Sequence, residues 1–217
     1  MKNPKFYAAK ASIDSIYPGM TIGVGTGSTV DELIPQLPSD CRYVASSIRT
    51  GQSLNAHNLT VLEFNEVDKI DVYIDGADAI YPSFVLLKGG GGAMTREKIL
   101  ATFADKFIVI ADGTKWGQDF KNIACPVEVI DFTRSHVARQ IRAMGAHCEY
   151  RSGFKTDQGH VILDVYGFDL GQPNQLELSI KKIPGVIDSG LFALRRPECI
   201  LIADNDQVKK IDKDSDH

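Results

Sequence analysis

Four consecutive glycines at residues 89–92 join an apolar run to a helix-forming stretch. Glycine lets a backbone turn its N–H groups toward a ligand that no side chain crowds out. The helix behind such a joint starts with unpaired N–H groups and a partial positive charge. The segment therefore predicts an anion pocket, with Lys88 at its entry and Glu97 in or near the first helical turn. A flexible surface loop with Thr95 as a helix cap is the competing interpretation.

A second joint of this kind lies at residues 25–29, Gly-Thr-Gly-Ser-Thr, between a strand at 20–24 and a helix at 30–37. Free N–H groups and hydroxyls at such a turn suit a phosphate. The turn lacks the lysine of a P-loop. It also lacks the third glycine of a dinucleotide fingerprint and an acidic residue about 20 positions on. It therefore predicts a site for a phosphate monoester or sugar hydroxyls, or an ordinary Ser/Thr-capped turn.

Further strands are predicted at 43–47, 59–64 and 70–74, and the last of them ends in Asp75-Gly-Ala-Asp78. Ligands in open α/β sheets gather at the carboxyl ends of strands. Two carboxylates three residues apart at such an end predict a ligand site. An Asx-turn followed by a helix cap is the alternative.

Lysine also follows a predicted strand, where the apolar run 107–111 ends in Asp112-Gly-Thr-Lys115. Lys115 could bind an anion at the strand end or be a solvated turn residue. The helix before this strand is expected to direct three residues inward, namely Ile99, Leu100 and Phe103.

The pattern changes at Pro126, after which the predicted order is β-α-β-β-α-β, the ferredoxin-like unit. A final hairpin over 199–211 is expected to return to the first domain. The predicted fold class is α/β, with an open sheet domain and a smaller α+β domain. The boundaries are 1–125 plus 198–217 for the first domain and 126–197 for the second.

Composition excludes several classes of function. The net charge of -4 argues against binding nucleic acid or an anionic membrane through bulk charge. No apolar stretch reaches 18 residues, and the N-terminus lacks an apolar signal core. The four cysteines and five histidines are dispersed, which predicts buried thiols, no metal site and a cytoplasmic protein.

The predicted strand ends together carry hydroxyls, carboxylates and lysines, without a Ser-His pair or a nucleotide fingerprint. This set suits proton transfer on a small phosphorylated and hydroxylated molecule. Moving a proton beside a carbonyl needs a carboxylate base and donors for the enediolate oxygen.

Several motifs of the chain occur together in one known family. They are Gly23-Val-Gly-Thr-Gly-Ser-Thr29, Asp75-Gly-Ala-Asp78, Lys88-Gly-Gly-Gly with Thr95-Arg-Glu97-Lys, Ala111-Asp-Gly-Thr-Lys115, Pro126-Val-Glu-Val, and Ile183-Pro-Gly-Val with Gly190-Leu-Phe. On these motifs the sequence resembles ribose-5-phosphate isomerase of the A type over nearly its whole length.

The resemblance implies interconversion of ribose 5-phosphate and ribulose 5-phosphate without a metal or organic cofactor. It implies a Rossmann-like first domain that binds substrate and a ferredoxin-like second domain that serves as lid and dimerisation domain. The assembly implied is a homodimer or a dimer of dimers.

The resemblance also assigns roles to residues. Glu97 is implied as the base that moves a proton between C1 and C2. Asp75 and Asp78, with Gly76 and Ala77 between them, are implied to bind sugar hydroxyls, and one aspartate could assist ring opening. The other substrate-binding residues implied are Thr26, Gly27, Ser28, Thr29, Lys88, Gly89, Gly90, Gly91 and Lys115. Which lysine meets the phosphate and which the enediolate stays open.

The sequence departs from the family pattern at a few positions. Ala79 stands where glutamate is frequent, Gly92 stands where alanine is usual, and Gly113-Thr114 replaces Ala-Ser.

Two other functions are weighed against the isomerase. One is a CoA-transferase of the same fold, with Glu97 as nucleophile. The other is a non-catalytic sugar phosphate sensor.

Overall fold

The computed structural model describes residues 3–213, which divide into two compact units. Of the described residues, unit 1 contains 3–77, 96–116 and 197–213. Unit 2 contains residues 78–95 and 117–196. The predicted boundaries differ at 78–95 and 117–125, which belong to unit 2, and at 197, which belongs to unit 1. The roles expected of the two domains stay predictions.

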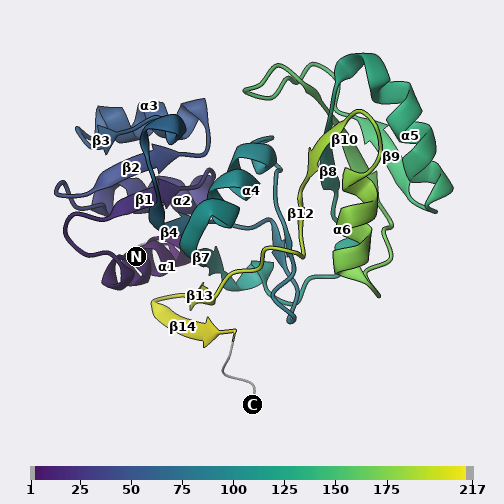
Figure 1. The fold of residues 1–217 in the computed structure, drawn as a ribbon. Helices are drawn as coiled ribbons and strands as arrows, with labels where there is room; N and C mark the ends of the chain where they lie inside the picture. The colour runs from purple at the N-terminus through teal and green to yellow at the C-terminus, as the bar shows by residue number, and fades with distance from the viewer. Residues whose placement is uncertain (1–2, 214–217) are drawn as a thin grey trace. The chain divides into compact units, whose positions relative to one another are not determined.

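Unit 1 is built on a seven-stranded sheet with the order β14-β13-β7-β4-β1-β2-β3 (Figure 1). All neighbours pair in parallel except the hairpin of β13 and β14, which is antiparallel. The strands are β1 (Thr21–Val24), β2 (Arg42–Ala45), β3 (Thr60–Val61), β4 (Ile70–Asp75), β7 (Ala104–Asp112), β13 (Cys199–Asp204) and β14 (Gln207–Asp212). The predicted open sheet and its returning hairpin are confirmed.

Helices α1 (Pro4–Ser12) and α2 (Ser28–Leu33) bury small and branched residues against one side of this sheet. Strand residues alternate between faces, and on β4 the cluster that these helices join contains Val72 and Ile74. Tyr73 therefore faces the other side, where its ring centroid lies 5.2 Å from that of Phe107. Asp75 shares the face of Tyr73.

Two expectations for unit 1 need correction. The strand expected at 59–64 is reduced to β3, because a reciprocal capping box of Glu63 and Glu66 starts a 3₁₀ turn at Phe64. Of the three residues of α4 (Met94–Phe103) that were expected to point inward, only Leu100 is buried, whereas Ile99 is 46% and Phe103 40% exposed. The remaining short helices are α3 (Ile48–Ala56), η1 (Ile13–Ser15), η2 (Ile34–Gln36), η3 (Phe64–Glu66) and η4 (Gly113–Lys115).

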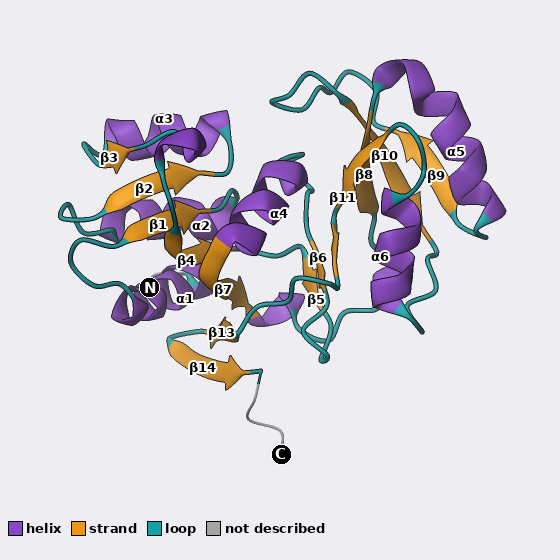
Figure 2. Cartoon of the chain, in the orientation of Figure 1, coloured by secondary structure: helices purple, strands orange, loops and turns teal. Residues whose placement is uncertain are grey.

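Unit 2 contains a four-stranded antiparallel sheet with the order β11-β8-β10-β9 and the helices α5 and α6 (Figure 2). Its chain order is β8 (Cys125–Val129), α5 (Arg134–Ala143), β9 (His147–Tyr150), β10 (Val161–Tyr166), α6 (Pro173–Lys181) and β11 (Val186–Ser189). The short helices are η5 (Phe120–Asn122) and η6 (Asp131–Thr133). The predicted ferredoxin-like order is confirmed.

The strand expected at 186–193 is two strands in different sheets. After β11 the chain turns at Gly190, and β12 (Leu191–Phe192) then joins β6 (Leu86–Leu87) and β5 (Ala79–Ile80). A Cβ atom at Gly190 would lie 2.1 Å from the carbonyl oxygen of Lys88, so only glycine fits there. This three-stranded sheet is the reason that residues 78–95 belong to unit 2.

The two faces of the four-stranded sheet have different roles. Val161, Leu163 and Val165 of β10 share a buried cluster with residues of α5 and α6. By alternation, Ile162 and Asp164 lie on the opposite face. Glu128 of β8 pairs with Ile162 in the register and lies on that same face.

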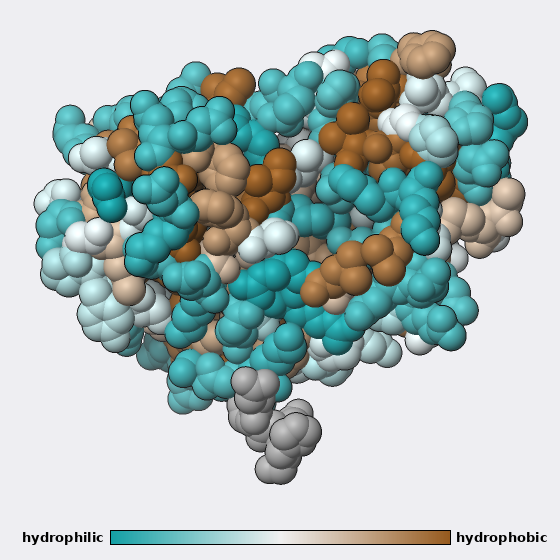
Figure 3. Space-filling view, in the orientation of Figure 1, coloured by the Kyte–Doolittle hydropathy of each residue, from teal (hydrophilic) through white to brown (hydrophobic). Residues whose placement is uncertain are grey.

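No helix in the described part of the chain is long and apolar enough to cross a membrane. On the face drawn in Figure 3, hydrophobic residues form separate brown groups among hydrophilic ones. The exposed large apolar side chains include Phe132, which is 93% exposed.

We expect Ile180→Ala to lower the free energy of unfolding by about 2–5 kcal/mol, because it leaves a cavity in the core of unit 2. Ile180 of α6 has no exposed surface. The control is Leu178→Ala on the same helix, since Leu178 is 40% exposed and surface changes usually stay within about 0.5 kcal/mol. Urea unfolding measures both, and equal effects would contradict the packing described for α6.

Candidate active site

The carboxyl ends of β1 and β4 meet at the point where the strand order of the unit 1 sheet reverses. From β1 the chain continues outward through β2 to β3, whereas β4 and β7 lie on the other side of β1. Ligands of open α/β sheets bind at such a switch point. The two loops that start there carry the predicted residues Thr26–Thr29 and Asp75–Ala77. The ends of the two strands are joined there, because the N–H of Gly25 donates to the carbonyl of Ile74 at 2.9 Å.

Asp75 is completely buried, and its carboxylate accepts hydrogen bonds from both neighbouring loops and from Tyr73. The N–H of Thr26 donates to Oδ1 at 3.1 Å, and the N–H of Gly76 donates to the same oxygen at 2.7 Å. The hydroxyl of Tyr73 donates to Oδ2. The carboxylate therefore links the loop after β4 to the loop after β1.

Gly25 makes this link possible. A Cβ atom there would lie 1.9 Å from Oδ1 and 2.0 Å from Cγ of Asp75. The carboxylate thus occupies the space of a side chain at residue 25. Gly27 has a φ of 141° at the start of α2, a backbone region that favours glycine.

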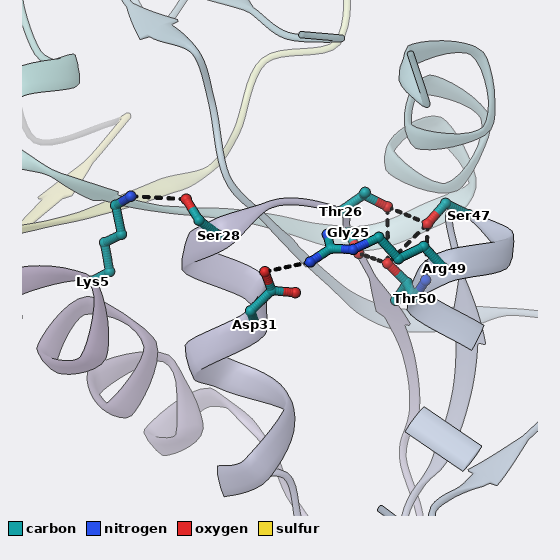
Figure 4. Close-up of polar contacts among 8 residues, drawn as sticks. All are labelled: Lys5, Gly25, Thr26, Ser28, Asp31, Ser47, Arg49 and Thr50. Atoms are coloured by element: carbon teal, nitrogen blue, oxygen red, sulfur yellow. Dashed lines mark hydrogen bonds and ion pairs between the residues drawn. The ribbon is translucent and has the colours of Figure 1, made fainter. Parts of the chain in front are cut away.

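Three hydroxyl groups from residues 46–50 surround Thr26, and those of Ser47 and Thr50 are drawn in Figure 4. Oγ1 of Thr26 lies 2.9 Å from Oγ of Ser46, 2.8 Å from Oγ of Ser47 and 2.9 Å from Oγ1 of Thr50. The hydroxyl of Thr50 donates in turn to the carbonyl of Gly25 at 2.8 Å. This network fixes the turn after β1 against the N-terminus of α3. The sequence showed hydroxyls at the end of the 43–47 strand, but only the fold places Thr50 beside Thr26.

Lys5 is a residue that the sequence prediction did not include. Its Nζ donates to Oγ of Ser28 at 2.8 Å, at the first residue of α2 (Figure 4). Lys5 also lines a cavity of about 650 Å³ with Asp112, Gly113 and Thr114. Lys115 is the next residue, at the end of η4. No local pattern distinguishes Lys5 from the other lysines near the N-terminus.

Glu97 lies in the first turn of α4 and is 3% exposed. Its charge acts on Tyr73, which is also fully buried. Burial raises the pKa of Tyr73 well above its usual value, and the negative charges of Asp75 and Glu97 raise this pKa further. Tyr73 is therefore a neutral hydrogen-bond donor between two carboxylates, and the sequence prediction did not include it.

Unit 2 contains the other predicted residues. Asp78 is bonded through its N–H to the carbonyl of Leu87 at 2.9 Å, and its Oδ2 accepts the N–H of Gly90 at 2.8 Å. Lys88 is 2% exposed, with its Nζ 5.7 Å from the ring centroid of Phe192. Asp78 and the predicted segment Lys88–Gly91 are thus brought together within this unit.

The two departures from the family pattern that flank this segment have structural explanations. Gly92 has a φ of 81°, and a Cβ atom there would lie 2.4 Å from the ring of Phe154. Ala79 is buried in β5, opposite Leu87 of β6. In the described residues, no group of three His, Cys, Asp or Glu side chains is arranged to hold a metal ion.

Comparison with known proteins identifies the family. The family model of ribose 5-phosphate isomerase A (phosphoriboisomerase A) matches residues 42–207. The chain belongs to this family. It is 50% identical over 201 residues to ribose-5-phosphate isomerase A of Acidithiobacillus ferrooxidans, covering 91% of this chain and 92% of that one. The Legionella pneumophila (strain Corby) protein of the same name is 43% identical, with 97% and 100% covered.

Solved structures of this family share the fold. The ribose 5-phosphate isomerase A structure from Neisseria gonorrhoeae superposes with a TM-score of 0.93 at 35% identity, covering 96% of each chain. A D-ribose-5-phosphate isomerase in complex with phospho-erythronic acid superposes with a TM-score of 0.91 at 32% identity, covering 96% of this chain and 97% of that one. The resemblance inferred from the motifs is confirmed, and the protein is an isomerase.

The raised pKa of Tyr73 predicts that the free energy of unfolding falls at alkaline pH. A tyrosine with a raised folded-state pKa contributes stability in full below its unfolded pKa of about 10, and loses it as pH rises through the folded value. We expect Tyr73→Phe to lower stability at neutral pH by about 1–3 kcal/mol, because Asp75 loses a donor. We also expect the variant to lose stability less steeply above about pH 10.

Urea unfolding at a series of pH values measures this effect. The control is Tyr17→Phe, because Tyr17 is 61% exposed. An alkaline loss of stability equally steep in the parent and in Tyr73→Phe would show that Tyr73 is not the group responsible.

Proposed function

We propose that this isomerase interconverts ribose 5-phosphate and ribulose 5-phosphate through an enediolate, with Glu97 as the general base. The observation that carries the proposal is a carboxylate of the first turn of α4 that is 3% exposed and interacts electrostatically with Tyr73. Family membership supports the substrate. A relative binds phospho-erythronic acid, a phosphorylated carboxylic acid of the size and charge expected of an enediolate mimic.

The reaction moves a proton between adjacent carbons. The base removes the C2 proton of the open-chain aldose, and the electron pair moves to form the enediolate. The same carboxyl group then returns the proton to C1, while a proton moves between O1 and O2. Glu97 suits this cycle because a buried carboxyl group exchanges its proton with the substrate and not with bulk water.

We assign Asp75 and the turn after β1 to the sugar hydroxyls. Asp75 binds the N–H groups of Thr26 and Gly76, and this link supports a common role for the carboxylate and the turn after β1. Thr26, Gly27, Ser28 and Thr29 complete this part of the proposed binding site.

The phosphate is assigned to the end of unit 1 that carries Lys5. The ammonium group of Lys5 and the hydroxyl of Ser28 are 2.8 Å apart, close enough for both to donate to one phosphate oxygen. Lys115, beside the cavity that Lys5 lines, is the second cation proposed for this site. This assignment leaves Lys88 for the reacting oxygens.

Asp78 and the segment Lys88–Gly91 are assigned to substrate by their motifs. The hydrogen bond between Gly90 and Asp78 supports a common role for them. For the second domain we propose the roles of lid and dimerisation domain, and for the assembly a homodimer or a dimer of dimers. The four cysteines are buried free thiols, which supports a reducing cytoplasmic location.

We expect Glu97→Gln to lower kcat for ribose 5-phosphate by about 100-fold or more, the scale of a lost general base. The purified parent should convert the substrate in the presence of EDTA. Glu149→Gln is the control, because the Glu149 side chain is 65% exposed. Ribulose 5-phosphate formation is the measurement, and thermal unfolding reports whether each variant is folded.

The outcomes separate the alternatives. Full activity in Glu97→Gln would move the base elsewhere, with Asp75 next in line. No turnover by the folded parent would favour the other two functions. Labelling of Glu97 by acyl-CoA would then indicate a CoA-transferase, and binding of ribose 5-phosphate without turnover would indicate a sensor.

We expect Lys5→Met to raise KM for ribose 5-phosphate by about 10- to 100-fold, because a charged donor to the phosphate contributes about 1.5–3 kcal/mol. Lys10→Met on the same helix is the matched control, since Lys10 is exposed. Steady-state kinetics measure both. An unchanged KM in Lys5→Met would place the phosphate elsewhere.

A further inference from the structure

Arg151, a residue of unit 2 that directly follows β9, binds the backbone of the glycine segment, which is residues 89–92. Nη1 of Arg151 donates to the carbonyl of Gly90 at 2.9 Å and to that of Gly89 at 3.4 Å. Glycines offer no side chain that packing could fix. The orientation of this backbone must therefore be set by groups that bind its N–H and carbonyl groups.

Arg151 is itself fixed by Asp164 of β10. Nε of Arg151 donates to Oδ2 of Asp164 at 2.8 Å, and Nη2 donates to Oδ1. The two side chains are only 19% and 16% exposed, so water competes little with the pair. Asp164 lies on the face of the four-stranded sheet opposite to the face that shares a core with α5 and α6, and a strand within a sheet is a rigid support.

Arginine is required by this geometry. One edge of the planar guanidinium binds the carboxylate in a bidentate manner, while its remaining nitrogen reaches two carbonyls. Lysine has a single nitrogen and cannot reproduce this bridge. Phe154, in the turn after Arg151, adds a second contact, because its ring occupies the space beside the Cα of Gly92.

The bonds of Arg151 to Asp164 and to the carbonyls of Gly89 and Gly90 are here called the clamp. The clamp determines where two N–H groups point. In a trans peptide the carbonyl and the N–H of the next residue lie on opposite sides, and all described peptides are trans. Because the carbonyls of Gly89 and Gly90 face Arg151, the N–H groups of Gly90 and Gly91 face away from it. The N–H of Gly90 accordingly meets Oδ2 of Asp78 at 2.8 Å.

We propose that Arg151, held by Asp164, is a positioning residue for the isomerisation, which orients the N–H of Gly91 toward the substrate oxygens while Asp78 binds the N–H of Gly90. Preorganised N–H donors stabilise charge that develops on oxygen. The inference rests on the proposed function in one respect, namely that the glycine segment contacts the substrate. The orientation of the segment by Arg151 can be tested independently of catalysis.

The test compares Arg151→Met with the parent by hydrogen exchange and kinetics. Methionine leaves an unbranched side chain near Phe154, whose ring centroid lies 5.4 Å from Cζ of Arg151, but removes the donors. We expect amide exchange in residues 89–92 to become about 10-fold faster or more, with exchange in β8 unchanged. We expect kcat to fall by about 10- to 100-fold, short of the about 100- to 1,000-fold loss when an oxyanion donor is removed.

Two further variants separate positioning from general destabilisation. Arg134→Met is the matched control, because the Arg134 guanidinium lies 4.2 Å from the ring centroid of Tyr150 in the same unit and, within the described residues, donates to none of the glycines 89–92. It should leave kcat and the exchange of 89–92 unchanged. Arg151→Lys should restore part of kcat. Asp164→Asn combined with Arg151→Met should cost no more than Arg151→Met alone, since both act through one ion pair.

Each outcome decides the proposal. Unchanged exchange of 89–92 in Arg151→Met would overturn the clamp, whatever the kinetics. Faster exchange with an unchanged kcat would overturn the role in the reaction. A folded parent without turnover would contradict the proposed function instead, and the exchange result would still decide whether Arg151 orients the segment.

Discussion

Asp75 accepts hydrogen bonds from the backbone N–H groups of Thr26 and Gly76 and from the hydroxyl of Tyr73, while its side chain is fully buried. A buried carboxylate is costly unless its oxygens are well hydrogen-bonded. The arrangement of unit 1 near the switch point follows from this requirement. Gly25 has no side chain because the carboxylate occupies that space. Tyr73 stays neutral, and therefore able to donate, because its burial and the two carboxylates near it raise its pKa.

Unit 2 must hold a segment without side chains, the glycines 89–92, in a single conformation. The glycine run can adopt many conformations, and the entropy lost on ordering it is large. Asp78 binds the N–H of Gly90, Arg151 binds the carbonyls of Gly89 and Gly90, and Phe154 packs against Gly92. These contacts come from residues outside the segment. They fix a conformation that the glycines alone would leave variable.

Both units thus contain buried polar groups, whose burial would cost free energy if they lacked hydrogen-bond partners. Glu128 shows the same principle, since it is fully buried and accepts hydrogen bonds from the hydroxyls of Thr95 and Thr156. Thr95 lies two residues before Glu97, at the start of α4. A buried carboxyl group of β8 therefore binds the residue two positions before the proposed base, and hydrophobic packing alone would not specify that position.

Local periodicity and motifs along the chain were enough to predict the family, the α/β class, the ferredoxin-like order of unit 2 and most strand positions. The tertiary structure decided what depends on distant residues. It split the strand expected at 186–193 between two sheets and left Ile99 and Phe103 exposed. It also placed Lys5 on Ser28 and Arg151 on the glycine segment. Neither lysine nor arginine is marked by a local pattern, since a long charged side chain acquires its partner only when the fold brings one within reach.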